Sequence, residues 1–175
     1  MAPPSVLSAA LDLALSATER FPLAVAQWLA RHFSLTAADA RDDENYALRK
    51  ACAHGHVAVA QWLTGHFSLT AADARADNND ALREACAGGH LAVAQWLTEH
   101  FDLAAADAYT GNNYALQRAC ANGHLAVAQW LTDRFGLLAG AARVDIRAAL
   151  RLARANEHRV VEQWLTEHFG IVATN

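Results

Sequence analysis

Several features that would place this chain in a common functional class are absent. Positive charge is not in excess, because 14 Lys and Arg stand against 18 Asp and Glu and the formal net charge is −4. This balance argues against a general nucleic-acid or anionic-membrane surface. No apolar run is long enough to span a bilayer. The apolar segment 6–17 follows no Lys or Arg and is interrupted by Asp12, so it predicts a helix rather than a signal peptide.

Cysteine is also scarce, and the spacing of the three cysteines is informative. Cys52, Cys86 and Cys120 follow one another at intervals of 34 residues. Packed helices lie about 8–10 Å apart, whereas a disulfide needs Cα atoms closer than about 7 Å. We therefore expect three free thiols. Free, regularly placed cysteines fit a reducing compartment, which predicts an intracellular, cytoplasmic protein, or one of the host cytoplasm or nucleus if it is viral.

The same interval organises the rest of the chain. Residues 89–98 recur almost unchanged from Gly55 and Gly123, with weaker copies from Phe21 and Glu157, and all five tryptophans keep the step of 34 residues. A fixed period of this size predicts stacked supersecondary units rather than one globular core. We divide the single domain into units of about 1–34, 35–68, 69–102, 103–136 and 137–175.

Each unit is predicted to contain two helices and a connector. In unit 69–102, Asn79 is a candidate N-cap for a first helix over about 80–87, and Gly89 ends that helix before a second one over about 91–100. In the connector, Thr70 and Asp73 approximate a capping box, which predicts a short helical turn. Ala104 replaces the threonine in the next copy, a loss that costs about 1 kcal/mol.

The run over residues 46–60, Tyr-Ala-Leu-Arg-Lys-Ala-Cys-Ala-His-Gly-His-Val-Ala-Val-Ala, resembles the ankyrin repeat. That family has Thr-Pro-Leu-His before two small residues and then Gly-His-Leu-Glu-Val-Val. The run is most similar to variant copies in protist and large DNA virus arrays, rich in Asn-Tyr-Ala-Leu-Arg and Trp-Leu. The resemblance implies an all-α, ankyrin-like solenoid of five stacked helix pairs. Tyr46-Ala47 stands where Thr-Pro is usual, and the connector tips lack glycine except Gly111. We therefore expect the short helical turn to replace the family's β-hairpin finger.

The two ends of the array are predicted to be caps. Residues 5–18 form the expected N-terminal helix. In the last unit, Arg154, Glu157, Arg159 and Glu162 replace cysteine, glycine, leucine and alanine of the earlier copies, and a charged outer face is what a terminal repeat needs. A basic stripe on the last unit's first helix is interpreted as a solvated cap face, the alternative being a contact for an acidic partner or a phosphate backbone. It comprises Arg143, Arg147, Arg151 and Arg154.

No residue set predicts a reaction, a metal site or a cofactor. The nine histidines mostly recur with the repeat, which indicates a structural role, and the resemblance implies that those after the glycine bond neighbouring loop backbone. Cys52, His54 and His56 offer at most three metal ligands, whereas structural zinc sites use four. The cysteines are expected on a buried helix stripe, where a thiol is inert. We therefore expect neither an enzyme nor a metalloprotein.

The functional expectation concerns a surface. Framework positions repeat, whereas residues at the connector tips and on the first helices differ from unit to unit, and in ankyrin-like stacks these elements line the concave partner-binding face. The prediction is a protein-interaction module, monomeric on its own, with no membrane or general nucleic-acid partner; the alternative is a structural spacer that makes contacts through its ends. The candidate partner-binding residues are Arg41, Asp42, Glu44, Tyr46, Lys50, His54, Arg75, Asp80, Glu84, Tyr109, Tyr114, Arg118 and Asn122.

Overall fold

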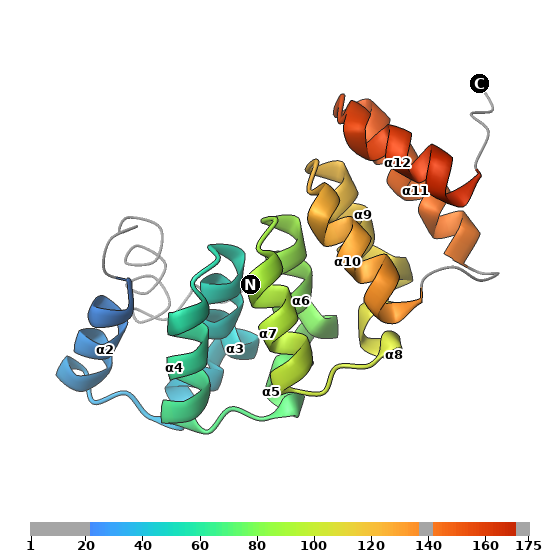
Figure 1. Cartoon of the computed structure of the whole chain (residues 1–175). Coiled ribbons are helices and arrows are strands. Elements are labelled where there is room, and N and C mark those ends of the chain that lie inside the picture. Colours follow the sequence, from blue (N-terminus) through green and yellow to red (C-terminus); the bar gives the residue numbers. More distant parts are fainter. Residues whose placement is uncertain (1–21, 137–141, 171–175) are drawn as a thin grey trace.

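The structure, a computed structural model, describes residues 22–136 and 142–170 as stacked helix pairs (Figure 1). The expected helix 5–18 and the connector 137–141 lie outside the described residues. No strand occurs in the described part, so the predicted all-α solenoid is confirmed. The helices are α2 (Pro22–His32), α3 (Ala37–Ala53), α4 (Val57–Phe67), α5 (Ala71–Ala74), α6 (Ala76–Ala87), α7 (Leu91–His100), α8 (Ala105–Ala108), α9 (Thr110–Ala121), α10 (Leu125–Phe135), α11 (Ala142–Ala155) and α12 (Arg159–Phe169).

The first helices of successive units form the tightly packed layer. Helices α3, α6, α9 and α11 contact one another extensively, whereas α4, α7 and α10 have few contacts among themselves. A stack that is tighter on one side curves toward that side, so the first helices lie on its concave side. One leucine per unit, Leu48, Leu82 or Leu116, is fully buried between these helices. The core is therefore continuous from unit to unit.

The capping turns form as predicted and take the place of a β-hairpin. In α5, the backbone N–H and the hydroxyl of Thr70 both donate to Asp73 Oδ2, at 2.7 and 2.9 Å. The turn at the start of α3 repeats this arrangement. In α8 the N–H of Ala104 still donates to Asp107 Oδ2 at 2.9 Å, so the carboxylate half of the cap survives the loss of threonine.

The capping role predicted for Asn79 is wrong. Asp77, Asn78 and Asn79 adopt three consecutive left-handed conformations, with φ of 46, 56 and 61°. The side-chain Nδ2 of Asn79 donates to Thr110 Oγ1 of the next unit at 3.1 Å, while its Oδ1 has no protein partner. A left-handed residue costs an ordinary side chain about 1–2 kcal/mol, and Asn and Asp tolerate it best. The acidic and amide residues at the tips therefore allow the backbone to adopt this left-handed conformation. Residues 43–45 have the same conformation.

A histidine of each following unit rests on the glycine of the unit before it. His90 Nε2 lies 2.9 Å from the carbonyl oxygen of Ala53, and His124 Nε2 lies 3.0 Å from that of Ala87. Because a carbonyl can only accept, Nε2 carries the proton in both rings. The predicted backbone bond is thus confirmed for these two histidines. Burial lowers the pKa of His90, more than its backbone hydrogen bond raises it.

The histidines before the phenylalanines have a different structural role. His66 stacks on Trp62, one helical turn earlier in α4, with ring centroids 4.8 Å apart. The other copies of this Trp-His pair, at residues 28 and 32, 96 and 100, and 164 and 168, are also stacked. Both sets of histidines thus have structural roles, one in the loops between units and the other on the outer helices.

Two glycine substitutions separate the cost of a left-handed backbone from the cost of overpacking against the histidine. Gly89 has φ of +76°, and a Cβ there would lie 2.5 Å from His124 Nδ1, whereas Gly136 has φ of +62° with no atom within 4 Å. Gly136→Ala should cost about 1–2 kcal/mol for the left-handed alanine. Gly89→Ala should cost about 1–3 kcal/mol more because it also overpacks the site. Urea denaturation of the two variants measures the difference, and equal losses would contradict the contact.

Candidate protein-interaction surface

A hollow opens on the concave side between α3 and α6. Its volume is about 480 Å³. Five candidate partner-binding residues, drawn from two units, meet there: Glu44, Tyr46, Lys50, Asp80 and Glu84. The remaining lining residues are Asp43, Arg49, Ala53 and Asp77.

Arg49 ties the floor of the hollow together. Its Nη1 lies 2.9 Å from Asp80 Oδ2 and 3.7 Å from Asp77 Oδ2, and its Nη2 donates to the backbone oxygen of Asp43 at 2.7 Å. The Arg49 side chain is 19% exposed and that of Asp80 is 10% exposed, so this pair is a fixed element. The backbone bond to Asp43 also supports the left-handed turn. Asp80 therefore acts mainly as a structural partner for Arg49.

The concave surface continues onto α9. The guanidinium of Arg83 lies 4.6 Å from the ring centroid of Tyr114, and that of Arg118 lies 5.7 Å from it. Tyr114 occupies the position of Asp80 one unit later, so a cation–π contact replaces an ion pair at this junction. Tyr114 is half-buried, and Arg118 is exposed.

The remaining candidates lie at the two margins of this face. Asp42 is exposed beside the left-handed turn. At the opposite ends of the first helices, His54 is exposed with its ring 6.1 Å from that of His56, and Asn122 Nδ2 donates to Ala87 O of the preceding unit at 2.7 Å. Tyr109 is half-buried and packs against the core. The structure therefore gathers the candidates into a centre and a rim rather than one patch.

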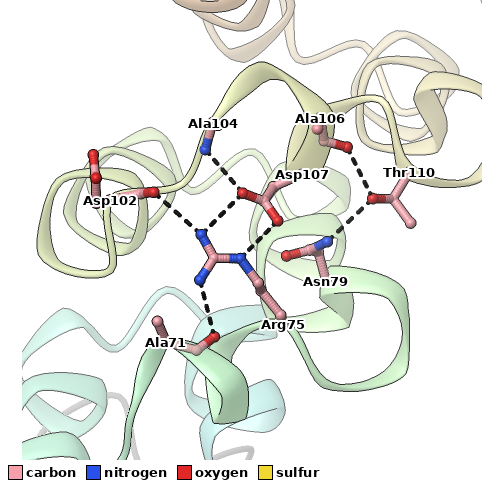
Figure 2. Close-up of polar contacts among 8 residues, drawn as sticks. All are labelled: Ala71, Arg75, Asn79, Asp102, Ala104, Ala106, Asp107 and Thr110. Carbon is pink, nitrogen blue, oxygen red and sulfur yellow. Dashed lines mark hydrogen bonds and ion pairs between the residues drawn. The ribbon is translucent and has the colours of Figure 1, made fainter.

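Arg41 and Arg75 join successive units. Figure 2 shows Arg75 with Nε 2.8 Å from Asp107 Oδ1 and Nη2 donating to Asp107 Oδ2 at 3.1 Å and to Asp102 O at 3.2 Å. Arg41 makes the same two-pronged contact with Asp73, at 2.9 and 3.1 Å. A bidentate pair fixes both distance and orientation. These arginines thus connect one unit to the capping carboxylate of the next.

The environment of these carboxylates stabilises their charged form. Burial alone would raise the pKa of Asp107, but hydrogen bonds from Arg75 and from the Ala104 backbone outweigh it, so the pKa lies below the ordinary value of 3.8. At Asp73, burial also raises the pKa, but the hydrogen bonds from the Thr70 backbone and from Arg41 lower it more, so the pKa again lies below its ordinary value. The hydrogen bond to Asp107 raises the pKa of Arg75. The inter-unit pairs are therefore intact at neutral pH.

Cys52 and the neighbouring histidines do not converge. Cys52 is 0% exposed in the core, whereas His54 is exposed at the end of α3. Within the described residues, no three His, Cys, Asp or Glu side chains are grouped as metal ligands. The three cysteines are free and buried, as predicted. Burial raises the pKa of all three thiols, that of Cys120 to about 12.

The charges on the last unit are partly paired with each other. Arg154 Nε lies 2.5 Å from Glu162 Oε1 across α11 and α12. Arg147 and Arg151, from the predicted basic stripe, are exposed, and the side chain of Arg143 lies outside the described part. Two of the three described arginines of the stripe thus have the solvated character expected of a cap face.

Sequence reasoning missed four residues of the hollow: the small Ala53 and the charged Asp43, Arg49 and Asp77. Arg49 was overlooked because arginine recurs at its position in the next unit, which suggested framework rather than surface. Asp43 and Asp77 were overlooked although the next copy has Gly111 there. That change from acid to glycine was the available signal, since it marks both a varied charge and a left-handed position.

The Arg75 pair makes a pH-dependent contribution to stability. Arg75→Ala should lower the free energy of unfolding at pH 7 by about 1–2 kcal/mol, because a bidentate pair is lost but its guanidinium is partly exposed. A carboxyl whose pKa is lowered on folding contributes stability to the folded protein at pH values above its ordinary pKa. This contribution is lost as the pH falls through 3.8 toward the pKa in the folded protein. The variant's deficit should therefore shrink below about pH 4. Urea denaturation at both pH values tests this, with exposed Arg151→Ala as the control; a pH-independent deficit would refute it.

Thiol reactivity tests the buried cysteines. The three thiols, those of Cys52, Cys86 and Cys120, should react with an aromatic disulfide reagent far more slowly in the native protein than in about 8 M urea, where the chain is denatured. In the native protein the thiolate is both scarce and inaccessible. Absorbance of the released thiolate follows the reaction. Rapid native labelling of any of the three at pH 8, about the pKa of a free thiol, would show that the core opens.

Among residues 22–136 and 142–170, no helix combines the length and apolar character needed to cross a membrane.

Comparison with known proteins agrees with this geometry. No curated protein and no solved structure matches the chain. A family model described as ankyrin repeats, in three copies, matches residues 51–148. Ankyrin repeats are in general protein–protein interaction modules and not catalysts. With more than half of its length matched and its helix pairs stacked through histidine and glycine, the chain belongs to the ankyrin repeat family.

Proposed function

We propose that this chain is a non-catalytic module that binds a partner protein through the concave face formed by α3, α6 and α9. The observation that carries the proposal is the contrast between two sets of positions on the same helices. Those that face the neighbouring units are alike in the three central copies, as with Leu48, Leu82 and Leu116. Those on the concave side differ in size and charge.

The variation is concentrated at two positions of the first helix. One carries a tyrosine, an aspartate and a tyrosine in successive units, and the other a lysine, a glutamate and an arginine. Apart from Asp80, which is paired with Arg49, the stacking of the units does not require these side chains, so the changes give each unit its own contact chemistry. In chain order the residues are Tyr46, Asp80 and Tyr114, and Lys50, Glu84 and Arg118.

The two tyrosines are suited to anchor a partner. Each is half-buried and has cations beside its ring: Lys50 Nζ is 5.2 Å from the ring centroid of Tyr46, and Arg83 is 4.6 Å from that of Tyr114. A tyrosine held in this way loses little conformational entropy on binding, and tyrosine is frequent among residues that dominate interface energetics. Arg41, Arg75 and Asp80 hold the face in shape through their ion pairs.

Affinity capture from a lysate tests the assignment. Tyr46→Ala combined with Tyr114→Ala should reduce recovery of a specific partner at least tenfold, since loss of one anchor alone costs about 1–2 kcal/mol or more. Quantitative mass spectrometry compares each bait with the unchanged chain. Circular dichroism must show that the double variant remains folded.

The matched control lies on the outer helices. Gln61 in α4 and Glu99 in α7 are exposed, so Gln61→Ala combined with Glu99→Ala should leave recovery within about twofold, as expected for surface changes outside an interface. A partner lost from the control and kept by the tyrosine variant would place the binding site on the outer face and defeat the proposal.

A further inference from the structure

The hollow between α3 and α6 carries a surplus of negative charge. Its carboxylates outnumber its cations by five to two. Because the site is concave, the field of these groups adds up inside it instead of spreading over an open surface. The acidic residues are Asp43, Glu44, Asp77, Asp80 and Glu84, and the basic residues are Arg49 and Lys50.

The guanidinium of Arg49 is shared among three of these acids. It lies 2.9 Å from Asp80, 3.7 Å from Asp77 and 3.8 Å from Asp43. Asp80 also receives Arg83, whose Nη2 lies 3.4 Å from Asp80 Oδ1, so two guanidinium groups face three carboxylates and a negative surplus remains. The side chains of Asp43 and Asp77 remain 54% and 40% exposed, so both stay accessible to an incoming group.

This surplus belongs to one junction and is not a property of the repeat. At the next junction Gly111, Tyr114 and Arg118 stand at the positions of Asp77, Asp80 and Glu84. No acid remains at these three positions, and Arg83 stacks on the tyrosine. A charge that served only to solvate the helix or hold the stack would be expected at both junctions.

We propose that the hollow binds a lysine or arginine side chain from an extended, basic segment of the partner protein. The inference rests on the proposed interaction function and adds the chemistry of the occupant. Glu44, Asp77 and Glu84 supply the negative charge, and Tyr46, whose ring already has Lys50 Nζ at 5.2 Å from its centroid, provides an aromatic wall for the aliphatic stem. The volume of about 480 Å³ lies in the range of about 300–1,000 Å³ typical of ligand pockets, so it holds a long side chain with adjoining backbone.

A polypeptide fits this site better than a small free cation. Helix α9, which carries Tyr114 and Arg118, packs directly against α6, so a chain seated by its basic residue can gain further contacts on the next unit. A free polyamine would meet only the carboxylates, and such exposed charge contacts are weak in salt. The occupant is therefore a basic peptide segment.

Selection from a random library of displayed 12-residue peptides, at physiological salt, tests this occupant. Peptides enriched by the unchanged chain should be rich in Lys and Arg. The best of them, synthesised and followed by fluorescence anisotropy, should bind Asp77→Asn/Glu84→Gln at least tenfold more weakly. This variant spares the Arg49–Asp80 pair, and asparagine is tolerated at the left-handed position of residue 77.

The control removes the same two charges from the outer helices. Glu99→Gln/Asp133→Asn changes exposed residues of α7 and α10 and should alter peptide affinity less than twofold. The proposal is wrong if no sequence is enriched, if the enriched peptides are neutral or acidic, if both variants weaken binding equally, or if free spermine binds as tightly as the peptide. Should the tyrosine variant still lose its captured partner in such a case, the interaction function stands and only the basic occupant is refuted.

Discussion

The contact of a histidine with the glycine of the preceding unit sets the distance and angle at which the units stack. The imidazole of His124 lies where a Cβ on Gly89 would be, and it donates a hydrogen bond to the Ala87 carbonyl that the helix end leaves unpaired. A larger residue at Gly89 would separate the units, and a residue without a ring donor at 124 would leave the Ala87 carbonyl with only the hydrogen bond from Asn122 Nδ2.

A second set of contacts holds the opposite ends of the first helices. Here three left-handed residues connect the capping turn to the helix, a conformation with an energetic cost for any residue with a Cβ. Several polar contacts secure it: Arg49 binds the Asp43 backbone oxygen, Asn79 binds Thr110, and Arg75 binds Asp107. Both ends of α3, α6 and α9 are therefore attached to the next unit by side chains, and the apolar core fills the space between.

This division leaves the concave side available for recognition. Stacking uses residues that point along the array, and the pairs of Arg41 and Arg75 belong to that set. The residues left over differ from unit to unit and combine aromatic rings with charge. A scaffold built in this way can change its specificity without losing stability, because the two tasks depend on different side chains.

The sequence by itself determined the period, the helix pairs, the capping turns and the buried thiols, because each of these depends on local chemistry repeated every 34 residues. Thr70 and Asp73 lie within one turn, and Gly89 ends its own helix, so neighbours in the chain suffice to recognise them. Only the tertiary structure decided which varied residues share a site. Arg75 and Asp107 are 32 residues apart, as are their counterparts in the previous unit, and only stacking makes them partners. The hollow likewise needs Arg49 from one unit and Asp77 and Asp80 from the next, and no local pattern specifies a contact between residues on separate helices.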